Sequence, residues 1–227
     1  MLTLIIDTST ERSLVAIVRN LVPIFVQNLP FGHNASKNLL PMIQKGLTKT
    51  SLAVNNFDAI TVGIGPGSYT GIRVAASVAK ALAFACQTPL IGICTLHAFS
   101  PKKDGPFATL IDAKISGTYL VKGYKQQEEV FFTSPPQVSS ITQTPQLLGK
   151  TSCLLTPNSQ RLSKELFSSS NNSFEWIETS PCPKQFARLA NEDLMNGKIS
   201  LNNHLELKYL RKTQAEIERS HITESIV

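Results

Sequence analysis

The segment GIGPGSYTGIR, residues 63–73, holds the residue types best suited to binding chemistry in this sequence. Its pattern predicts an apolar strand that runs into glycines and a helix that begins near Ser68 or Thr70. Glycine permits close backbone approach, and the first N–H groups of a helix attract an anion or a carbonyl oxygen. The hydroxyls of Ser68 and Thr70 can instead cap these groups. Because the spacing matches neither a GxGxxG fingerprint nor a P-loop, both interpretations stay open, with capping favoured.

Asp7 ends the first apolar run, and hydroxyl residues follow it in a turn. An Asp in this position can orient a metal-bound water or a phosphate, although it can equally cap the turn. Asp112 also ends an apolar run, in the second half of the chain, so the two carboxylates could flank a nucleotide cleft. The candidate contacts for a nucleotide or an anion are Asp7, Thr8, Ser9, Gly65, Gly67 and Ser68.

Other catalytic machinery is missing from the sequence. The four cysteines form no CxxC pair, and no HExxH, GxSxG or P-loop lysine motif occurs. His33 would need a second ligand one turn later on its helix, but Lys37 stands there and repels a cation. We therefore expect no catalytic residue, no metal site and no cofactor bound by this chain alone.

The helix predicted from about residue 70 to residue 87 is apolar on almost every side over residues 72–86, with Arg73, Ser77 and Lys80 as the polar residues of that stretch. A surface helix is normally apolar on one face only, so this pattern predicts burial on two sides. One side should face the chain's own sheet. For the other side two hypotheses stay open: it packs against a partner protein, or it packs against the rest of the same chain. The partner hypothesis predicts an interface formed by Leu39, Leu40, Ile43, Ile72, Ala75, Ala76, Ala79 and Ala83.

The elements that position these residues follow the order β-β-β-α-β-α-β in the first half. Three short apolar runs predict an antiparallel meander, and a helix begins near residue 34. The polar stretch KKDGP predicts a boundary, which divides the chain into an N-terminal lobe (1–103) and a smaller C-terminal lobe with a polar tail (104–227). In the second part we expect strands at 107–111, 118–124, 130–133, 153–155 and 174–177, helices at 157–167 and 183–195, and a surface loop at 134–145.

Composition narrows the class further. The chain has 227 residues, 42% of them hydrophobic and 17% charged, which excludes a disordered protein. No apolar run is long enough for a membrane helix, and the first residues carry no signal-peptide pattern. Scattered cysteines without a framework suggest reduced thiols and a cytoplasmic location. The net charge of +6 has no basic run, so we favour ordinary solubility charge over an RNA-binding patch.

Six segments in order, IDTST, HNASKNLLPMI, ITVGIGPGSYTGIRVAASVAKALA, PLIGICTLHA, LIDAKISGTYLV and KYLR, resemble the bacterial TsaB family, also called YeaZ. GPGSYTGIR is the most specific of them. The resemblance implies an α/β fold of two ribonuclease-H-like lobes, in the group that includes actin, sugar kinases and Hsp70 ATPases. The element order derived above agrees with that fold.

The resemblance also implies a role in forming N6-threonylcarbamoyladenosine next to the anticodon of tRNAs that read codons starting with A. In this system a TsaD-like paralogue is catalytic, and TsaB-like chains pair with it through a helical bundle, joined by a TsaE-like ATPase. The catalytic relative carries HxxxH, of which only His33 remains here, with Lys37 in the second place. A heterodimer is therefore expected, with tRNA reached through the complex and no membrane; a homodimer of the isolated chain is the alternative.

Residues 134–183 match this pattern weakly, which predicts a trimmed or irregular second lobe and a poor nucleotide cleft. We therefore expect the isolated chain to bind ATP weakly or not at all. Binding of ATP or ADP is an expectation for the complex only. The competing hypothesis is a nucleotide-binding enzyme of the same fold, such as a small kinase or ATPase, with Asp7 as its metal-orienting acid. A metallopeptidase is disfavoured by the missing zinc ligands.

Overall fold

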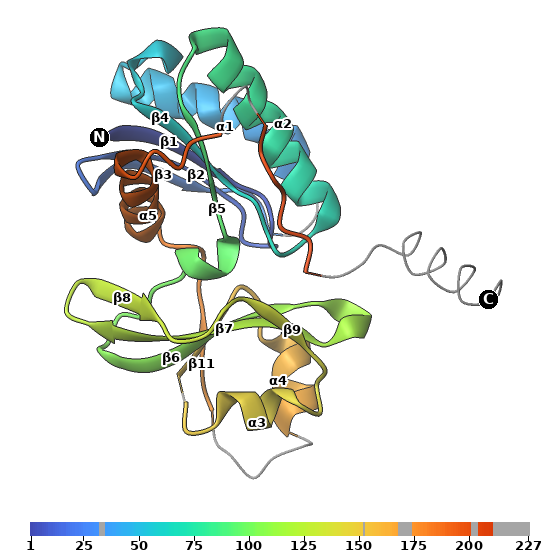
Figure 1. Ribbon diagram of the computed structural model, residues 1–227. Coiled ribbons are helices and arrows are strands. Elements are labelled where there is room, and N and C mark those ends of the chain that lie inside the picture. Colours follow the sequence, from blue (N-terminus) through green and yellow to red (C-terminus); the bar gives the residue numbers. More distant parts are fainter. Residues whose placement is uncertain (32–34, 152, 168–173, 201–203, 211–227) are drawn as a thin grey trace, which may run out of the picture.

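The computed structural model describes residues 1–31, 35–151, 153–167, 174–200 and 204–210. It contains two mixed sheets, one above the other, each covered by helices (Figure 1). The predicted α/β fold of two lobes is therefore confirmed. Within the described residues, no helix has both the length and the apolar character needed to cross a membrane.

The first sheet has the strand order β3-β2-β1-β4-β5. The meander of β1 (Leu2–Asp7), β2 (Leu14–Arg19) and β3 (Val22–Asn28) is antiparallel, whereas β4 (Ala59–Gly63) and β5 (Leu90–Ile93) run parallel to β1. A sheet covered on both faces needs continuous apolar runs. In β1, Leu4 and Ile6 therefore pack on one side and Ile5 on the other.

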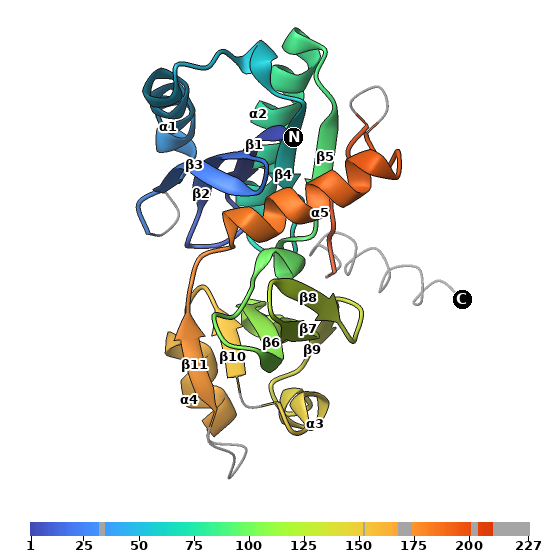
Figure 2. The same cartoon turned by 90° about the vertical axis from the view of Figure 1, so that its left-hand side faces the viewer.

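Three helices cover this first sheet. Helices α1 (Ala35–Thr50) and α2 (Tyr69–Cys86) lie on the face that Leu4 and Ile6 enter. Helix α5 (Pro183–Met195) crosses the opposite face, where Phe186, Ala187 and Ala190 pack against Ile5 (Figure 2). The expected assignment of residues 104–227 to a second lobe thus needs correction, because α5 returns to the first lobe to cover an otherwise bare apolar sheet face.

The second sheet has the order β11-β10-β6-β7-β8, with β9 paired to β7. Its strands are β6 (Gly105–Asp112), β7 (Thr118–Gln126), β8 (Glu129–Phe132), β9 (Gln137–Ser139), β10 (Cys153–Thr156) and β11 (Glu175–Glu178). Helices α3 (Thr144–Leu148) and α4 (Gln160–Phe167) cover its outer face, where Leu148, Leu162 and Leu166 pack against Leu110 and Leu120.

Two expectations for this lobe were wrong. The stretch 134–145 is more than a surface loop, because it contains β9 and the start of α3. The lobe is also not irregular. Although the sequence signals over residues 134–183 are weak, this segment contributes leucines that cover the outer face of the sheet. Short strands of this kind are recognised poorly from local pattern because their partners lie far along the chain.

Within residues 1–200, the described chain passes from one lobe to the other after β5, through the 3₁₀ turn Thr95–Ala98, and returns between β11 and α5. The two crossing segments are bonded to each other, since the Cys182 N–H donates to the Ala98 carbonyl over 2.7 Å. Leu96 and Phe99 from the first crossing fill the space against Phe107 and Val121 of the second sheet. The first crossing segment therefore packs into the apolar core of the second lobe.

Candidate functional site

The glycine-rich turn before α2 packs directly on the turn that follows β1. A Cβ added at Gly67 would lie 2.1 Å from the Ser9 carbonyl oxygen, and one at Gly71 would lie 1.9 Å from the Thr8 carbonyl oxygen. These approaches leave no room for a side chain. The two glycines therefore permit contact between turns of the same lobe.

The first N–H groups of α2 are capped by a side chain of the protein itself. Ser68 occupies the N-cap position, and its hydroxyl accepts a hydrogen bond from the Gly71 N–H over 3.2 Å. The Ser68 N–H donates to the Ser9 carbonyl over 2.7 Å, and the Thr8 hydroxyl donates to the Gly71 carbonyl over 2.6 Å. The capping interpretation of the sequence is thus what the structure shows at Ser68.

Asp7 lies beneath this turn rather than in it. Its side chain is fully buried, and its Oδ1 accepts the Ser9 N–H over 2.7 Å. Among the described residues, its Oδ2 has no hydrogen-bond partner. Burial raises the pKa of Asp7, and the hydrogen bonds from Ser9 and Thr95 oppose this increase. A Cβ at Gly63 would collide with the carboxylate, so Asp7 organises the turn from below.

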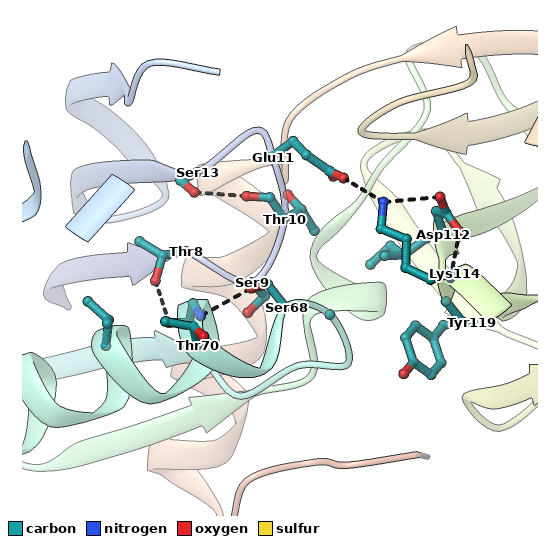
Figure 3. Close-up of a pocket in the computed structure, with 15 residues that line it drawn as sticks. Thr8, Ser9, Thr10, Glu11, Ser13, Ser68, Thr70, Asp112, Lys114 and Tyr119 are labelled. Atoms are coloured by element: carbon teal, nitrogen blue, oxygen red, sulfur yellow. Dashed lines mark hydrogen bonds and ion pairs between the residues drawn. The ribbon is translucent and has the colours of Figure 1, made fainter. Parts of the chain in front are cut away.

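A cavity of about 340 Å³ lies between the lobes above this turn. Figure 3 shows hydroxyl side chains from the first lobe on one side of it, including Thr8, Ser9 and Ser68, and Asp112, Lys114 and Tyr119 from the second lobe on the other. The full lining comprises Thr8, Ser9, Thr10, Glu11, Ser13, Gly67, Ser68, Thr70, Gly71, Val74, Ile111, Asp112, Ala113, Lys114 and Tyr119.

The charged residues of the cavity are paired with one another. The Lys114 ammonium lies 3.2 Å from Asp112 Oδ2 and 3.6 Å from Glu11 Oε1, so it links the two lobes. Asp112 also pairs with Arg161 of α4 at 3.1 Å. Next to Glu11 in the sequence, Arg12 reaches the second lobe, where it pairs with Glu178 at 2.7 Å. Ion pairs thus join the lobes across the cleft.

Of the residues predicted to contact a nucleotide or an anion, the structure brings four together in this cavity: Thr8, Ser9, Gly67 and Ser68. Asp7 and Gly65 do not line it. Gly65 instead faces Ile72 and the Lys208 carbonyl. Asp112 was expected from the sequence as a strand-end carboxylate, but Glu11 and Lys114 were not among the expected site residues. Each lies two residues after a residue that the sequence did single out, Ser9 or Asp112, and this spacing was the available signal.

The predicted partner interface requires a correction. Seven of its eight residues, Leu39, Ile43, Ile72, Ala75, Ala76, Ala79 and Ala83, are buried in the chain's own core, and only Leu40 is exposed. They lie on the sides of α1 and α2 that face the first sheet. The polar residues Arg73 and Ser77 mark the exposed side of α2, but the apolar residues on its other sides gave no sign of which of them face the sheet.

The outer face of α2 carries different residues. Ser77, Ala81, Phe84 and Ala85 are exposed, and the Phe84 ring is 75% exposed. Near the start of the helix, Arg73 stacks on Tyr69 and donates to the Tyr209 hydroxyl over 3.2 Å. Tyr209 of the KYLR motif thus lies beside the start of α2, and the Lys208 N–H donates to the Ile64 carbonyl over 2.9 Å.

No metal centre is evident in the described part of the chain, where no three His, Cys, Asp or Glu residues cluster as ligands. His33, the residue expected to remain from a ligand pair, lies outside the described residues. Lys37, at the expected second position, is exposed at the start of α1.

The sequence is similar to proteins of tRNA modification. Residues 31–149, slightly more than half of the chain, match the family model "TsaD: tRNA N6-adenosine threonylcarbamoyltransferase". The tRNA threonylcarbamoyladenosine biosynthesis protein TsaB of Haemophilus influenzae is 36% identical over 122 residues, covering 52% of this chain and 51% of that protein. The Escherichia coli TsaB is 33% identical over 131 residues, covering 55% of each. The chain thus matches about half the length of these relatives.

Solved structures show the same fold over nearly the whole chain. A Pseudomonas aeruginosa protein described as similar to peptidase YEAZ superposes with a TM-score of 0.77 at 23% identity, covering 92% of this chain and 99% of that one. YeaZ from Pseudomonas aeruginosa superposes with a TM-score of 0.71 at 22% identity, covering 88% and 94%. At these identities the likeness concerns the fold.

Proposed function

Because the chain belongs to the TsaB (YeaZ) family, we propose that it takes part in forming N6-threonylcarbamoyladenosine in tRNA, as the non-catalytic partner of a TsaD-like threonylcarbamoyltransferase. The modified adenosine is the one next to the anticodon of tRNAs that read codons starting with A. The family model and the names of the relatives support the pathway. The role as a partner is supported by the surface of α2.

The outer face of α2 is the observation that carries this proposal. Over its last two turns, Ala81, Phe84 and Ala85 are exposed, and Lys80, one turn before Phe84, is the charged residue beside them. Small side chains let two helices approach closely, and a protruding aromatic ring is a frequent anchor of protein interfaces. We propose that this face, extended by the exposed Leu40 of α1, meets the helices of the partner. It replaces the buried alanines of the original hypothesis.

The cleft supports a subunit without an active site of its own. Asp7 is enclosed beneath the turn, and Lys114 is paired with carboxylates of both lobes. A TsaE-like ATPase, tRNA bound through the complex, a homodimer of the isolated chain and a cytoplasmic location complete the proposal as further expectations from the family.

Reconstitution of tRNA threonylcarbamoylation tests the role. The TsaD-like paralogue, the TsaE-like ATPase, threonylcarbamoyl-adenylate and tRNA are combined with and without this chain. We expect modification only when the chain is present, and none from the chain alone. Modification at an unchanged rate without the chain would overturn the proposal.

The same assay tests the surface. Phe84→Glu places a charge on the outer face of α2 and should lower modification at least about tenfold, together with co-elution of the paralogue. The matched control is Phe131→Glu on β8, which changes an exposed aromatic residue of the other lobe and should leave both unchanged. Equal effects of the two variants would exclude α2 as the interface.

A nucleotide-using enzyme of the same fold is the second candidate, favoured by the hydroxyl-lined cavity between the lobes. It predicts that ATP with Mg²⁺ raises the melting temperature of the isolated chain. An unchanged melting temperature up to millimolar ATP would count against it.

A further inference from the structure

The cavity between the lobes is rich in hydroxyl groups, yet its charges leave no cation unopposed among the residues that line it. Glu11 and Asp112 contribute two carboxylates, and Lys114 contributes one ammonium. From outside the cavity, Arg161 neutralises Asp112 at 3.1 Å. The ammonium of Lys114 is then balanced by Glu11, 3.6 Å away on the other lobe.

The position of Lys114 is set by its backbone as well as by its charge. Its φ of 56° lies in the left-handed region, which is costly for a residue with a side chain. Three hydrogen bonds hold it there: its N–H donates to Asp112 Oδ1 over 2.7 Å, and its carbonyl accepts from Arg161 Nη2 over 2.6 Å and from the Gly117 N–H over 3.1 Å. The ammonium is therefore held at the cleft, pointing toward Glu11 (Figure 3).

Glu11 is positioned to meet it. Its side chain is 16% exposed, whereas that of Lys114 is 60% exposed, so the carboxylate forms the more enclosed side of the pair. Arg12, the next residue, is held by Glu178 at 2.7 Å and by the Pro157 carbonyl. These contacts fix the Glu11–Arg12 segment against the second lobe.

A polyphosphate entering this cavity would meet the Glu11 carboxylate at close range, and Coulomb repulsion is strong in a partly enclosed space. The Ser68 and Gly71 N–H groups and the Thr8 hydroxyl offer little compensation, because they already donate within the chain. Without Glu11, Lys114 would keep only Asp112, which it shares with Arg161, so the two cations would outnumber the carboxylate between them and the cavity would attract an anion.

We propose that Glu11 is an internal counter-ion that masks Lys114 and so excludes phosphate-bearing ligands from the cleft between the lobes. Glu11 is then the specificity-determining residue of the cavity. The inference concerns the isolated chain and does not depend on its role in tRNA modification.

Calorimetric titration with inorganic pyrophosphate at low salt tests the proposal. For the wild-type chain we expect no binding up to millimolar pyrophosphate. Glu11→Gln keeps the size of the side chain and removes its charge. We expect the variant to bind pyrophosphate with a dissociation constant at least about tenfold below the weakest one that the titration of the wild type can detect. Thermal melting verifies that the variant is folded. Micromolar binding by the wild type, or no gain in a folded Glu11→Gln variant, would overturn the proposal.

Two further variants test whether the gain in pyrophosphate binding depends on Glu11 and Lys114. Glu175→Gln on β11 makes the same charge change outside the cavity and should gain nothing. Glu11→Gln combined with Lys114→Met should lose the gain, because the receiving cation is gone. A double variant that still binds, or a Glu175→Gln variant that gains equally, shows that Lys114 is not unmasked. The readout is direct binding, so its failure is separate from failure of the reconstitution.

Discussion

Thr8 and Gly71 join the turn after β1 to the first turn of α2 through a hydrogen bond and a backbone contact. The Thr8 hydroxyl donates to the Gly71 carbonyl over 2.6 Å, while a Cβ at Gly71 would lie 1.9 Å from the Thr8 carbonyl oxygen. Gly67 allows the same close approach of two backbones as Gly71, since a Cβ at Gly67 would meet the Ser9 carbonyl oxygen. The floor of the cleft is therefore built by packing of backbone against backbone.

The first prediction follows from this contact. Gly71→Ala should lower the free energy of unfolding by about 2 kcal/mol, because the cost of overpacking exceeds the gain in helix propensity. Chemical denaturation followed by circular dichroism measures it. Ser77→Ala, an exposed change in the same helix, should stay within about 0.5 kcal/mol of the wild type. Equal stability of the two variants would show that the turns can move apart without cost.

The second prediction separates the inner and outer faces of α2. Ala79 is fully buried against the first sheet, so Ala79→Glu buries a charge and should prevent folding. Phe84→Glu, on the outer face, should keep the wild-type melting temperature. Circular dichroism melting and size-exclusion chromatography distinguish the two. A folded Ala79→Glu variant would mean that this side of α2 is not core.

The third prediction concerns the ion pair between the lobes. Glu178 Oε1 accepts from both the N–H and the hydroxyl of Ser159, and Oε2 accepts from Arg12. These hydrogen bonds, with those from Ser159 the largest cause, lower the pKa of Glu178. A lowered pKa stabilises the fold above the ordinary value of 4.5, and this contribution is lost as the pH falls below it.

Glu178→Gln should therefore cost about 0.5–1 kcal/mol at neutral pH and low salt, because the pair is largely exposed and screened. Hydrogen exchange at the Ser159 amide should quicken in the variant. The control is Glu175→Gln, whose carboxylate lies 3.9 Å from Lys103 at the surface and should change neither quantity. An unchanged Ser159 amide in Glu178→Gln would contradict the hydrogen bond from Ser159 to Glu178, and unchanged stability would show that the Arg12–Glu178 pair adds nothing between the lobes.

The fourth prediction is a pH dependence located at the junction of the lobes. His97 stacks on Phe132 of β8 with ring centroids 4.2 Å apart. Burial, helped by the charge of Lys208, lowers the pKa of His97 from 6.5 to about 4. The unfolded chain then takes up a proton before the folded chain does. The free energy of unfolding should fall as the pH decreases from about 6.5 to about 4, by up to about 3 kcal/mol.

Replacement by an aromatic residue isolates this contribution. His97→Phe keeps the stack on Phe132 and cannot be protonated, so its stability should depend less steeply on pH over the same range. Urea denaturation at several pH values measures both proteins. Asp7, whose pKa burial raises, contributes with the opposite sign but equally in both, and cancels from the comparison. Parallel pH profiles would show that His97 is not the responsible group.

Local pattern determined much of this fold. The helix expected at residues 183–195 has those bounds, and α2 begins after the cap at Ser68. Caps and side-chain periodicity act over a few residues, so they can be read from adjacent positions. The β-β-β-α-β-α-β order and the strand-end positions of Asp7 and Asp112 came from the same signals.

Only the tertiary structure decided which residues meet. The polar stripe of α2 marked one exposed side, but it did not show that Phe84 lies on that side, and packing against the sheet determines that Ala79 is buried and Phe84 exposed. Glu11 and Lys114 lie about a hundred residues apart in the sequence and come within 3.6 Å because the lobes meet at the cleft. Contacts between distant segments depend on how lobes and helix faces pack, which no local pattern encodes.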